Sequence, residues 1–101
     1  LLIVMVENIE IEKMKIGDIS EKEIGRNVKI AGKISRMTQT PGLIILEIED
    51  ASGKISGVLF KEETINLSLG QEGEFGGKIR DYKGKQEIEI EEIKITKHDR
   101  W

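Results

Sequence analysis

Apolar and polar residues alternate along much of the chain, most clearly over residues 43–60. A period of two is expected for a β-strand that buries one face and exposes the other. Residues 50–53, Asp-Ala-Ser-Gly, interrupt the alternation with residue types that favour turns. The pattern therefore predicts a β-hairpin, whose second strand places Ile55 and Leu59 on one face and Phe60 on the other.

A second alternating stretch, residues 26–37, precedes this hairpin. It predicts a strand that points Val28, Ile30 and Ile34 inward. Gly32 takes an inward position in the same pattern, and a glycine inside a strand often marks a bulge or a sharp bend. We therefore expect this strand to bend at Gly32.

An irregular segment and a short helix are expected on either side of the hairpin. Residues 38–42 contain the only proline of the chain and predict a loop. Residues 61–69 predict a short helix or helical turn, with Ile65 and Leu69 on one side and Gly70 at its end.

Two more strands are predicted towards the C-terminus, over residues 74–82 and 85–95. In the first, Phe75 and Ile79 point inward, and Gly77 marks a second bend. In the second, the alternation changes phase before its last two isoleucines. A turn at residues 81–84 joins the two strands, so the pattern predicts a second hairpin.

The two ends of the chain have weaker patterns. Residues 1–15 alternate loosely and predict an extended arm or an extra strand, with a helix as the alternative. Ser20 and Glu23 have the spacing of a capping box, in which each side chain accepts a hydrogen bond from the other residue's backbone N–H. Residues 97–101 predict a tail, so we expect the folded domain over residues 16–96.

Composition suggests a small, soluble protein of the cytoplasm. A chain of 101 residues forms one domain with a modest core. Because the chain has no cysteine, disulfides and thiolate metal sites are excluded, and a reducing compartment is expected. The six apolar residues at the start are too short to span a bilayer. The first residue is leucine, so either the true start is Met5 or the sequence is a piece of a longer protein, and we expect the second. The lysine-, glutamate- and isoleucine-rich composition suits a thermophile or an archaeon.

The element order, five strands with a short helix between the third and the fourth, is that of an OB-fold barrel. Three motifs carry this likeness: Val28-x-Ile30-x-Gly32-x-Ile34, Asp50-x-x-Gly53-x-Ile55 and Phe75-x-Gly77-x-Ile79-x-x-Tyr82-x-Gly84. Over residues 16–95 the chain resembles OB-fold nucleic-acid-binding domains of the tRNA-anticodon/helicase type, and it is similar to the OB domains of archaeal replication protein A. The resemblance implies an all-β, five-stranded Greek-key barrel with a short helix between strands 3 and 4.

Catalytic chemistry has little support in the sequence. The single histidine, His98, lies in the tail, and neither Gly-x-x-x-x-Gly-Lys nor Gly-x-Ser-x-Gly occurs. Four glutamates alternate with isoleucines in the last strand, which indicates the solvated face of a strand; a carboxylate metal site is the alternative. We therefore expect neither enzyme activity nor a cofactor. The four residues are Glu87, Glu89, Glu91 and Glu92.

The resemblance implies that single-stranded DNA or RNA lies across the second and third strands, between the loops at residues 38–42 and 81–84. These segments carry cations for phosphates and two rings on which bases can stack, each stack being worth roughly 1–3 kcal/mol. The expected nucleic-acid-binding residues are Lys33, Arg36, Gln39, Lys54, Phe60, Lys61, Arg80, Tyr82, Lys83 and Lys85.

Simpler interpretations of these residues stay open. Phe60 could close one end of the barrel, Tyr82 could anchor its loop, and residues 83–85 could be an ordinary basic hairpin tip. Glu47 and Glu49 project onto the surface where phosphates would lie, and the net charge of −3 lowers the affinity expected for them.

Two functions follow. The first is an OB-fold module that binds single-stranded DNA or RNA with low sequence specificity, micromolar or weaker affinity and strong salt dependence. It would belong to a replication, repair or RNA-processing protein, such as a replication protein A homologue; anticodon binding is a variant. The alternative is a protein-interaction or oligomerisation module that uses exposed strand edges or the apolar residues 1–4. No membrane partner is expected.

Overall fold

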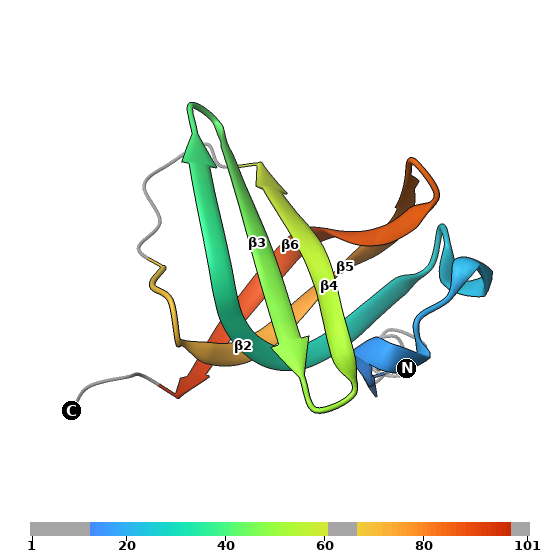
Figure 1. Ribbon diagram of the computed structural model, residues 1–101, viewed down its shortest axis with the longest axis horizontal. Coiled ribbons are helices and arrows are strands. Elements are labelled where there is room, and N and C mark those ends of the chain that lie inside the picture. The colour runs from blue at the N-terminus through green and yellow to red at the C-terminus, as the bar shows by residue number, and fades with distance from the viewer. Residues whose placement is uncertain (1–12, 61–66, 98–101) are drawn as a thin grey trace, which may run out of the picture.

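The computed structural model describes residues 13–60 and 67–97 of the chain. These residues form six strands and two single turns of 3₁₀ helix, and the strands wrap into a barrel (Figure 1). Within these two ranges, no helix has the length and apolar character needed to cross a membrane. The strands are β1 (Lys13–Met14), β2 (Asn27–Thr40), β3 (Leu43–Asp50), β4 (Gly53–Phe60), β5 (Glu72–Tyr82) and β6 (Lys85–Lys97), and the 3₁₀ turns are η1 (Ile16–Asp18) and η2 (Glu21–Glu23).

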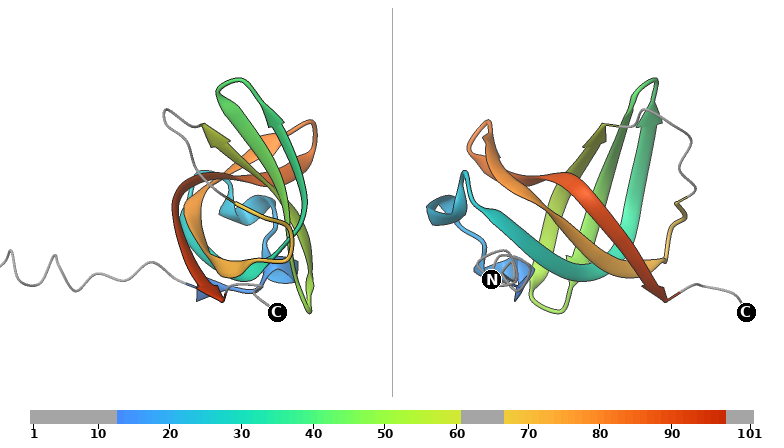
Figure 2. Two further views of the ribbon diagram at one scale, coloured as in Figure 1. Left: turned by 90° about the vertical axis from the view of Figure 1, so that its left-hand side faces the viewer. Right: turned by 180° about the vertical axis from the view of Figure 1, so that it is seen from behind.

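The strands are ordered β1-β2-β3-β4-β6-β5, and a second pairing of β2 with β5 closes the barrel (Figure 2). The neighbours in the barrel are antiparallel except β4 and β6, which are parallel. This topology confirms the five-stranded OB-fold barrel. β1 pairs with β2 in parallel, so an extra strand is confirmed at Lys13–Met14. The rest of the expected arm, residues 1–12, lies outside the described residues.

β2 belongs to both halves of the barrel because it bends at Gly32. Its residues up to Lys33 pair with β5, and those from Lys33 onward pair with β3. A Cβ atom on Gly32 would lie 2.7 Å from the carbonyl oxygen of Glu49, closer than real Cβ atoms approach other atoms. The predicted bend is confirmed, and this close approach explains why a glycine occupies it.

The second predicted bend coincides with a β-bulge. The register of β5 and β6 shifts between Gly76 and Gly77, where Glu91 of β6 has no partner on β5. The extra residue changes the phase of β6 between Ile90, which is buried, and Ile93, which is partly buried. The bend in β5 and the change of phase in β6 are both confirmed, and they have the same cause.

The core consists of aliphatic side chains packed around one phenylalanine, Phe75. All the apolar side chains that the sequence analysis points inward on the predicted strands are buried, and eight of the largest side chains are less than 2% exposed. The buried hydrophobic residues are Ile16, Val28, Ile30, Ile34, Ile44, Leu46, Ile48, Ile55, Leu59, Leu67, Phe75, Ile79, Ile88 and Ile90.

Three predicted strand boundaries are wrong by two residues or more. One is the end of β6, which continues past the predicted end at residue 95 to Lys97, the first residue of the predicted tail, because Lys97 pairs with Glu72 of β5. Residues 38–40 continue β2 instead of forming a loop, because they pair with residues 43–45 and threonine suits a pleated strand. The turn is reduced to residues 41–42. β5 begins at Glu72 rather than at residue 74. Its early start gives no hydrophobic signal, since the inward position there is held by the buried Gly73.

The described part of the short helix predicted over residues 61–69 is not helical. Residues 61–66 lie outside the described residues, and the chain from Leu67 to Gly70 is an irregular segment followed by a turn. Leu67 is buried in the core, whereas Leu69 is 56% exposed. The segment runs beside β2 because Gly70 donates its N–H to the carbonyl of Ile34, and Ile34 donates to Gln71.

The predicted capping box is confirmed at η2. The backbone N–H of Ser20 donates to Oε1 of Glu23 at 2.7 Å, and the N–H of Lys22 donates to Oγ of Ser20 at 3.3 Å. The hydrogen bond from the Ser20 backbone is the main reason why the pKa of Glu23 lies below its usual value. A local pattern of two residues therefore defines this turn.

Asp50 fastens the segment before β2 to the β3–β4 turn. Its Oδ2 accepts the N–H of Ile16 at 3.0 Å, and its Oδ1 accepts the N–H groups of Ser52 and Gly53 at 2.7 and 3.1 Å. Partial burial raises the pKa of Asp50, but these hydrogen bonds and one from the Ser52 hydroxyl outweigh it and lower the pKa. The ionised carboxylate therefore stabilises the fold.

Candidate nucleic-acid interface

The outer face of β3 and β4 lies between two projecting hairpins (Figure 1). One is the β2–β3 hairpin, and the other is the β5–β6 hairpin, which turns at Lys83 and Gly84. Burial alternates along β3 and β4, so every second side chain points away from the core. The outward residues are Leu43, Ile45, Glu47 and Glu49 on β3, and Lys54, Ser56, Val58 and Phe60 on β4.

The half of this face nearer the β2–β3 turn is uncharged over the residues that the structure describes. Ile45 is 39% exposed, and Phe60 is 57% exposed. A flat, apolar surface with an exposed ring is suited to stacking of bases. The strand register arranges the uncharged side chains in two neighbouring rows, Thr38 with Ile45 and Val58, and Thr40 with Leu43 and Phe60.

The other half of the face carries charges of both signs. Nζ of Lys54 lies 4.0 Å from Glu47, and the guanidinium of Arg80 lies 3.5 Å from Glu87 and 3.7 Å from Glu89. The pairs of Lys54 with Glu47 and of Arg80 with Glu89 are open to solvent and contribute little to stability, whereas the side chain of Glu87 is only 12% exposed. The pairs still place a cation beside each of these three carboxylates, so the acids do not dominate the face. The register forms one row across five strands from Arg36, Glu47, Ser56, Glu87 and Arg80.

A cleft of about 480 Å³ opens between β4 and the β5–β6 hairpin. It lies where β4 and β6 diverge, because these two strands pair over only three residues each. Glu47 and Glu87 line the cleft together with Lys54 and Lys85, so its acidic and basic residues balance. The ring of Tyr82 forms part of its wall.

The tip of the β5–β6 hairpin combines an aromatic ring with a cation. Lys83 and Gly84 have φ angles of 53° and 86°, which are the positive values of a tight two-residue hairpin turn. This turn places Nζ of Lys83 5.3 Å from the centre of the Tyr82 ring, a cation–π contact. Tyr82 is 54% exposed, so the ring and the ammonium group are both accessible to a ligand.

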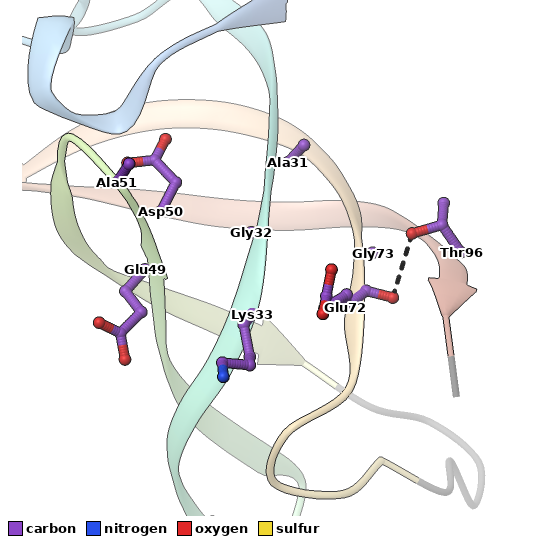
Figure 3. A pocket seen from close by; sticks show the side chains of 9 residues that line it. All are labelled: Ala31, Gly32, Lys33, Glu49, Asp50, Ala51, Glu72, Gly73 and Thr96. Carbon is purple, nitrogen blue, oxygen red and sulfur yellow. Dashed lines mark hydrogen bonds between the residues drawn. The ribbon is translucent and has the colours of Figure 1, made fainter. Parts of the chain in front are cut away.

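Two of the predicted site residues lie away from this face. Lys33 is at the bend of β2, opposite Glu49 and Glu72, and lines a separate hollow of about 500 Å³ (Figure 3). Gln39 pairs with the buried Ile44, so it belongs to the inner side of the β2–β3 hairpin. Lys33 lies beside the predicted bend, and the length of β2, which the alternation does not show, places Gln39 in a strand instead of the expected loop.

The structure brings most of the other predicted residues to the face or its rim, where their role in binding stays a prediction. Lys61 and the lone His98 lie outside the described residues. Ser56 was not among the predicted residues, and it meets Glu87 only through the parallel β4–β6 pairing, which no local pattern reveals. The residues brought together are Arg36, Lys54, Phe60, Arg80, Tyr82, Lys83 and Lys85.

The glutamates of β6 do not assemble a metal site with other side chains that the structure describes. In residues 13–60 and 67–97, no group of three or more histidine, cysteine or acidic side chains is placed to hold an ion. Glu87 and Glu89 face Arg80 instead.

The closed five-stranded barrel, with the outer face of β3 and β4 between two hairpins, is an OB-fold domain. A family model described as an OB-fold nucleic acid binding domain of the tRNA anti-codon type matches residues 28–96, which is more than half of the chain. The chain therefore belongs to this family of OB-fold nucleic acid binding domains. A comparison with curated proteins gives no match.

Solved structures share the fold at low sequence identity. An OBody bound to hen egg-white lysozyme has a TM-score of 0.73 and 20% identity, with 89% of this chain and 98% of that chain covered. Asparaginyl-tRNA synthetase from Pyrococcus horikoshii has a TM-score of 0.72 and 21% identity, with 85% and 23% covered. The S. pombe Stn1-ten1 complex has a TM-score of 0.74 and 20% identity, with 89% and 81% covered. The chain thus corresponds to about a quarter of the synthetase.

Proposed function

We propose that this domain binds single-stranded DNA or RNA across the outer face of β3 and β4, with little sequence preference. The observation that supports this most directly is the pair of exposed rings, Phe60 and Tyr82, on a surface framed by the two hairpins. Membership of a nucleic-acid-binding family gives independent support. Stacking on rings is tolerant of sequence, because every base has an aromatic face.

The uncharged and charged halves of the outer face of β3 and β4 suggest how a single-stranded nucleic acid would lie on it. Bases would stack against the uncharged rows and Phe60, away from the carboxylates. Phosphates would contact the accessible lysines at the rim, Lys54 and Lys85 among them, since the side chain of Lys54 is 61% exposed. Because cations and acids balance in the cleft, we expect micromolar or weaker affinity that falls as salt is raised.

Arg80 would act differently from the lysines. Its guanidinium lies between two carboxylates, at 3.5 Å from Glu87 and 3.7 Å from Glu89. It would therefore neutralise these acids and allow a phosphate to approach, rather than hold a phosphate as its main partner.

We further propose that the domain is a binding module of a larger cytoplasmic protein in replication, repair or RNA processing, and not an enzyme by itself. A replication protein A homologue is one candidate for DNA. The similarity to part of an asparaginyl-tRNA synthetase supports a module within a longer chain, with an RNA ligand as the corresponding candidate. Comparing matched DNA and RNA oligonucleotides separates these two possibilities.

Fluorescence anisotropy tests the proposal directly. A labelled single strand of about 15 nucleotides, near the upper end of the ~4–16 that one OB domain covers, is titrated with protein at low salt. We expect saturable binding that weakens with salt and is stronger than binding to a duplex of the same sequence. If anisotropy stays flat at high protein concentration for both DNA and RNA, the proposal is wrong.

A protein-binding role is the second candidate, favoured by the uncharged half of the face. Exposed Ile45 and Phe60 suit an apolar partner as well as they suit a base. Two of the similar structures are described as complexes, an OBody bound to lysozyme and Stn1-ten1. Sedimentation velocity over a range of protein concentrations tests self-association, and a monomer throughout would contradict that form of the idea.

A further inference from the structure

The register of β1, β2, β5 and β6 gathers a cluster of lysines on the outer surface of these strands, in the part of the barrel that does not include β3 and β4. Nζ of Lys13 lies 3.0 Å from Oε2 of Glu74, and Lys94 is directly opposite Glu74 on β6. Lys29 is directly opposite Lys13. We name Lys13, Lys29 and Lys94 the back lysine cluster, with Glu74 at its centre.

The fold holds these positive charges together against their repulsion. Like charges directly opposite each other on paired strands are unfavourable, and the register of β1 with β2 creates such a pair from Lys13 and Lys29. The hydrogen bond and charge of Lys13, followed by the charges of Lys29 and Lys94, lower the pKa of Glu74. Three ammonium groups therefore gather around Glu74 and one further carboxylate, a local excess of positive charge in a chain whose net charge is −3. Glu92 borders the cluster on β6.

The cluster remains accessible to a large anion. The side chain of Lys13 is 57% exposed even while it contacts Glu74, and Lys94 is also exposed. Lys29 is less open than the other two, because it is partly buried and the side chain of Glu92 lies over Gly76, the residue opposite Lys29. An extended polyanion could therefore contact two or three of these ammonium groups at once.

One strand links this surface to the proposed binding face. Along β5, every second residue points outward, from the ring of Tyr82 in the front cleft to Glu74 at the back. At roughly 3.3 Å per residue, this line is about 26 Å long. Between its ends it carries Lys78, which is exposed and lies opposite Glu89, and Arg80, which is paired with Glu87 and Glu89.

We propose that the back lysine cluster is a second contact for the phosphates of a single-stranded nucleic acid. An oligonucleotide long enough to extend beyond the outer face of β3 and β4 would reach the cluster along β5. The proposal rests on the proposed function for the identity of the polyanion. It predicts that long strands make phosphate contacts that short strands cannot reach.

Oligonucleotide length and salt dependence test this prediction. Binding is measured by anisotropy with oligonucleotides of about 6 and about 30 nucleotides, below and above most of the ~4–16 that one OB domain covers. The double variant Lys29→Gln/Lys94→Gln should bind the short strand as the wild type does. For the long strand, the slope of log K against log salt should become shallower by about 1.4, since each phosphate contact contributes about 0.7 in single strands.

Two further variants separate a binding role from a general effect of charge. Lys22→Gln removes an exposed lysine from η2 and should leave both slopes unchanged. Glu74→Gln removes the carboxylate that Lys13 now contacts, so the long strand should bind more tightly, with a slope steeper by about 0.7. A purely structural ion pair would not produce that gain. Circular dichroism verifies that each variant is folded.

The outcomes for the two sites are distinguishable. If the long strand has the same slope in the wild type and in the double variant, the back lysine cluster is not a phosphate contact. If the short strand fails to bind while the long strand depends on the cluster, the proposal for the front face fails and the cluster stands. If neither strand binds, both proposals are overturned.

Discussion

The two phenylalanines of the chain offer a matched test of the proposed binding face. Phe60 lies on the outer face of β4 and is 57% exposed, whereas Phe75 lies in the core and is 0% exposed. The same substitution, Phe to Ala, should therefore weaken binding at the first position and stability at the second. This contrast also decides whether Phe60 acts as a stacking surface or closes the end of the barrel.

The exposed fraction of each phenylalanine side chain sets the expected loss of stability in its alanine variant. Full burial of a phenylalanine side chain is worth about 1.5–3 kcal/mol, and Phe60 has lost less than half of its accessible surface, so Phe60→Ala should cost about 1 kcal/mol of stability or less. Loss of a base stack should cost roughly 1–3 kcal/mol of binding, which is about 5- to 150-fold in affinity. Phe75→Ala should destabilise the domain by about 3–5 kcal/mol, because it leaves a cavity in the core.

Urea unfolding and anisotropy titrations of the two variants provide the measurements. We expect Phe60→Ala to unfold near the wild-type urea concentration and to bind a single strand weakly. Phe75→Ala should unfold at much lower urea and, under conditions where it stays folded, bind nearly as well as the wild type. If Phe60→Ala binds like the wild type but is strongly destabilised, the ring closes the barrel and the stacking argument is refuted.

Three further changes test other parts of the structure. Gly77→Ala should destabilise the domain by about 1–3 kcal/mol in urea unfolding, because the new Cβ would overlap a backbone carbonyl of β6. Gly76→Ala should be tolerated, because the atom nearest to its new Cβ would be 3.5 Å away. Equal effects of the two substitutions would contradict the bulge geometry. Asp50→Asn replaces the acceptor for the N–H of Ile16 and should cost about 1 kcal/mol at neutral pH. The pKa of Asp50 in the folded state lies below its ordinary value of 3.8, so the ionised carboxylate stabilises the fold above about pH 4. This stabilisation is lost as the pH falls through the folded-state pKa. Asp50→Asn should therefore lose less stability than the wild type on acidification below about pH 4. Glu47→Gln removes a negative charge from the binding face and should tighten binding about 5-fold at low salt, as expected for about 1 kcal/mol between charges in water, with no gain in molar salt.

The fold could be predicted because the local pattern and the barrel agree. Alternation places the inward isoleucines correctly, and Gly32 and Gly77 occupy two of the positions where the barrel bends or bulges. The errors occur where the pattern has no signal. Threonine-rich residues 38–40 are extended because their partners in β3 hold them there, and the buried Gly73 at the start of β5 has no side chain that would identify it as an inward residue.

The candidate site was less predictable, because it depends on pairings between distant parts of the chain. Lys33 is near the expected loop in sequence but lies at the bend of β2, where it faces β5 as well as β3. Ser56 and Glu87 are neighbours only through the parallel pairing of β4 with β6. Tyr82 and Lys85, in contrast, flank a two-residue turn, so a local pattern was sufficient to place them together.

The short pairing of β4 with β6 has a consequence for how the ligand and the barrel affect each other. Three residue pairs form this seam, against eleven between β5 and β6, so the barrel should open there first when it fluctuates. A single-stranded nucleic acid that contacts Lys54 on β4 and Lys85 on β6 would hold these two strands together. Occupancy should therefore slow amide hydrogen exchange at Gly57 and Ile88, far more than it slows exchange in the β5–β6 ladder.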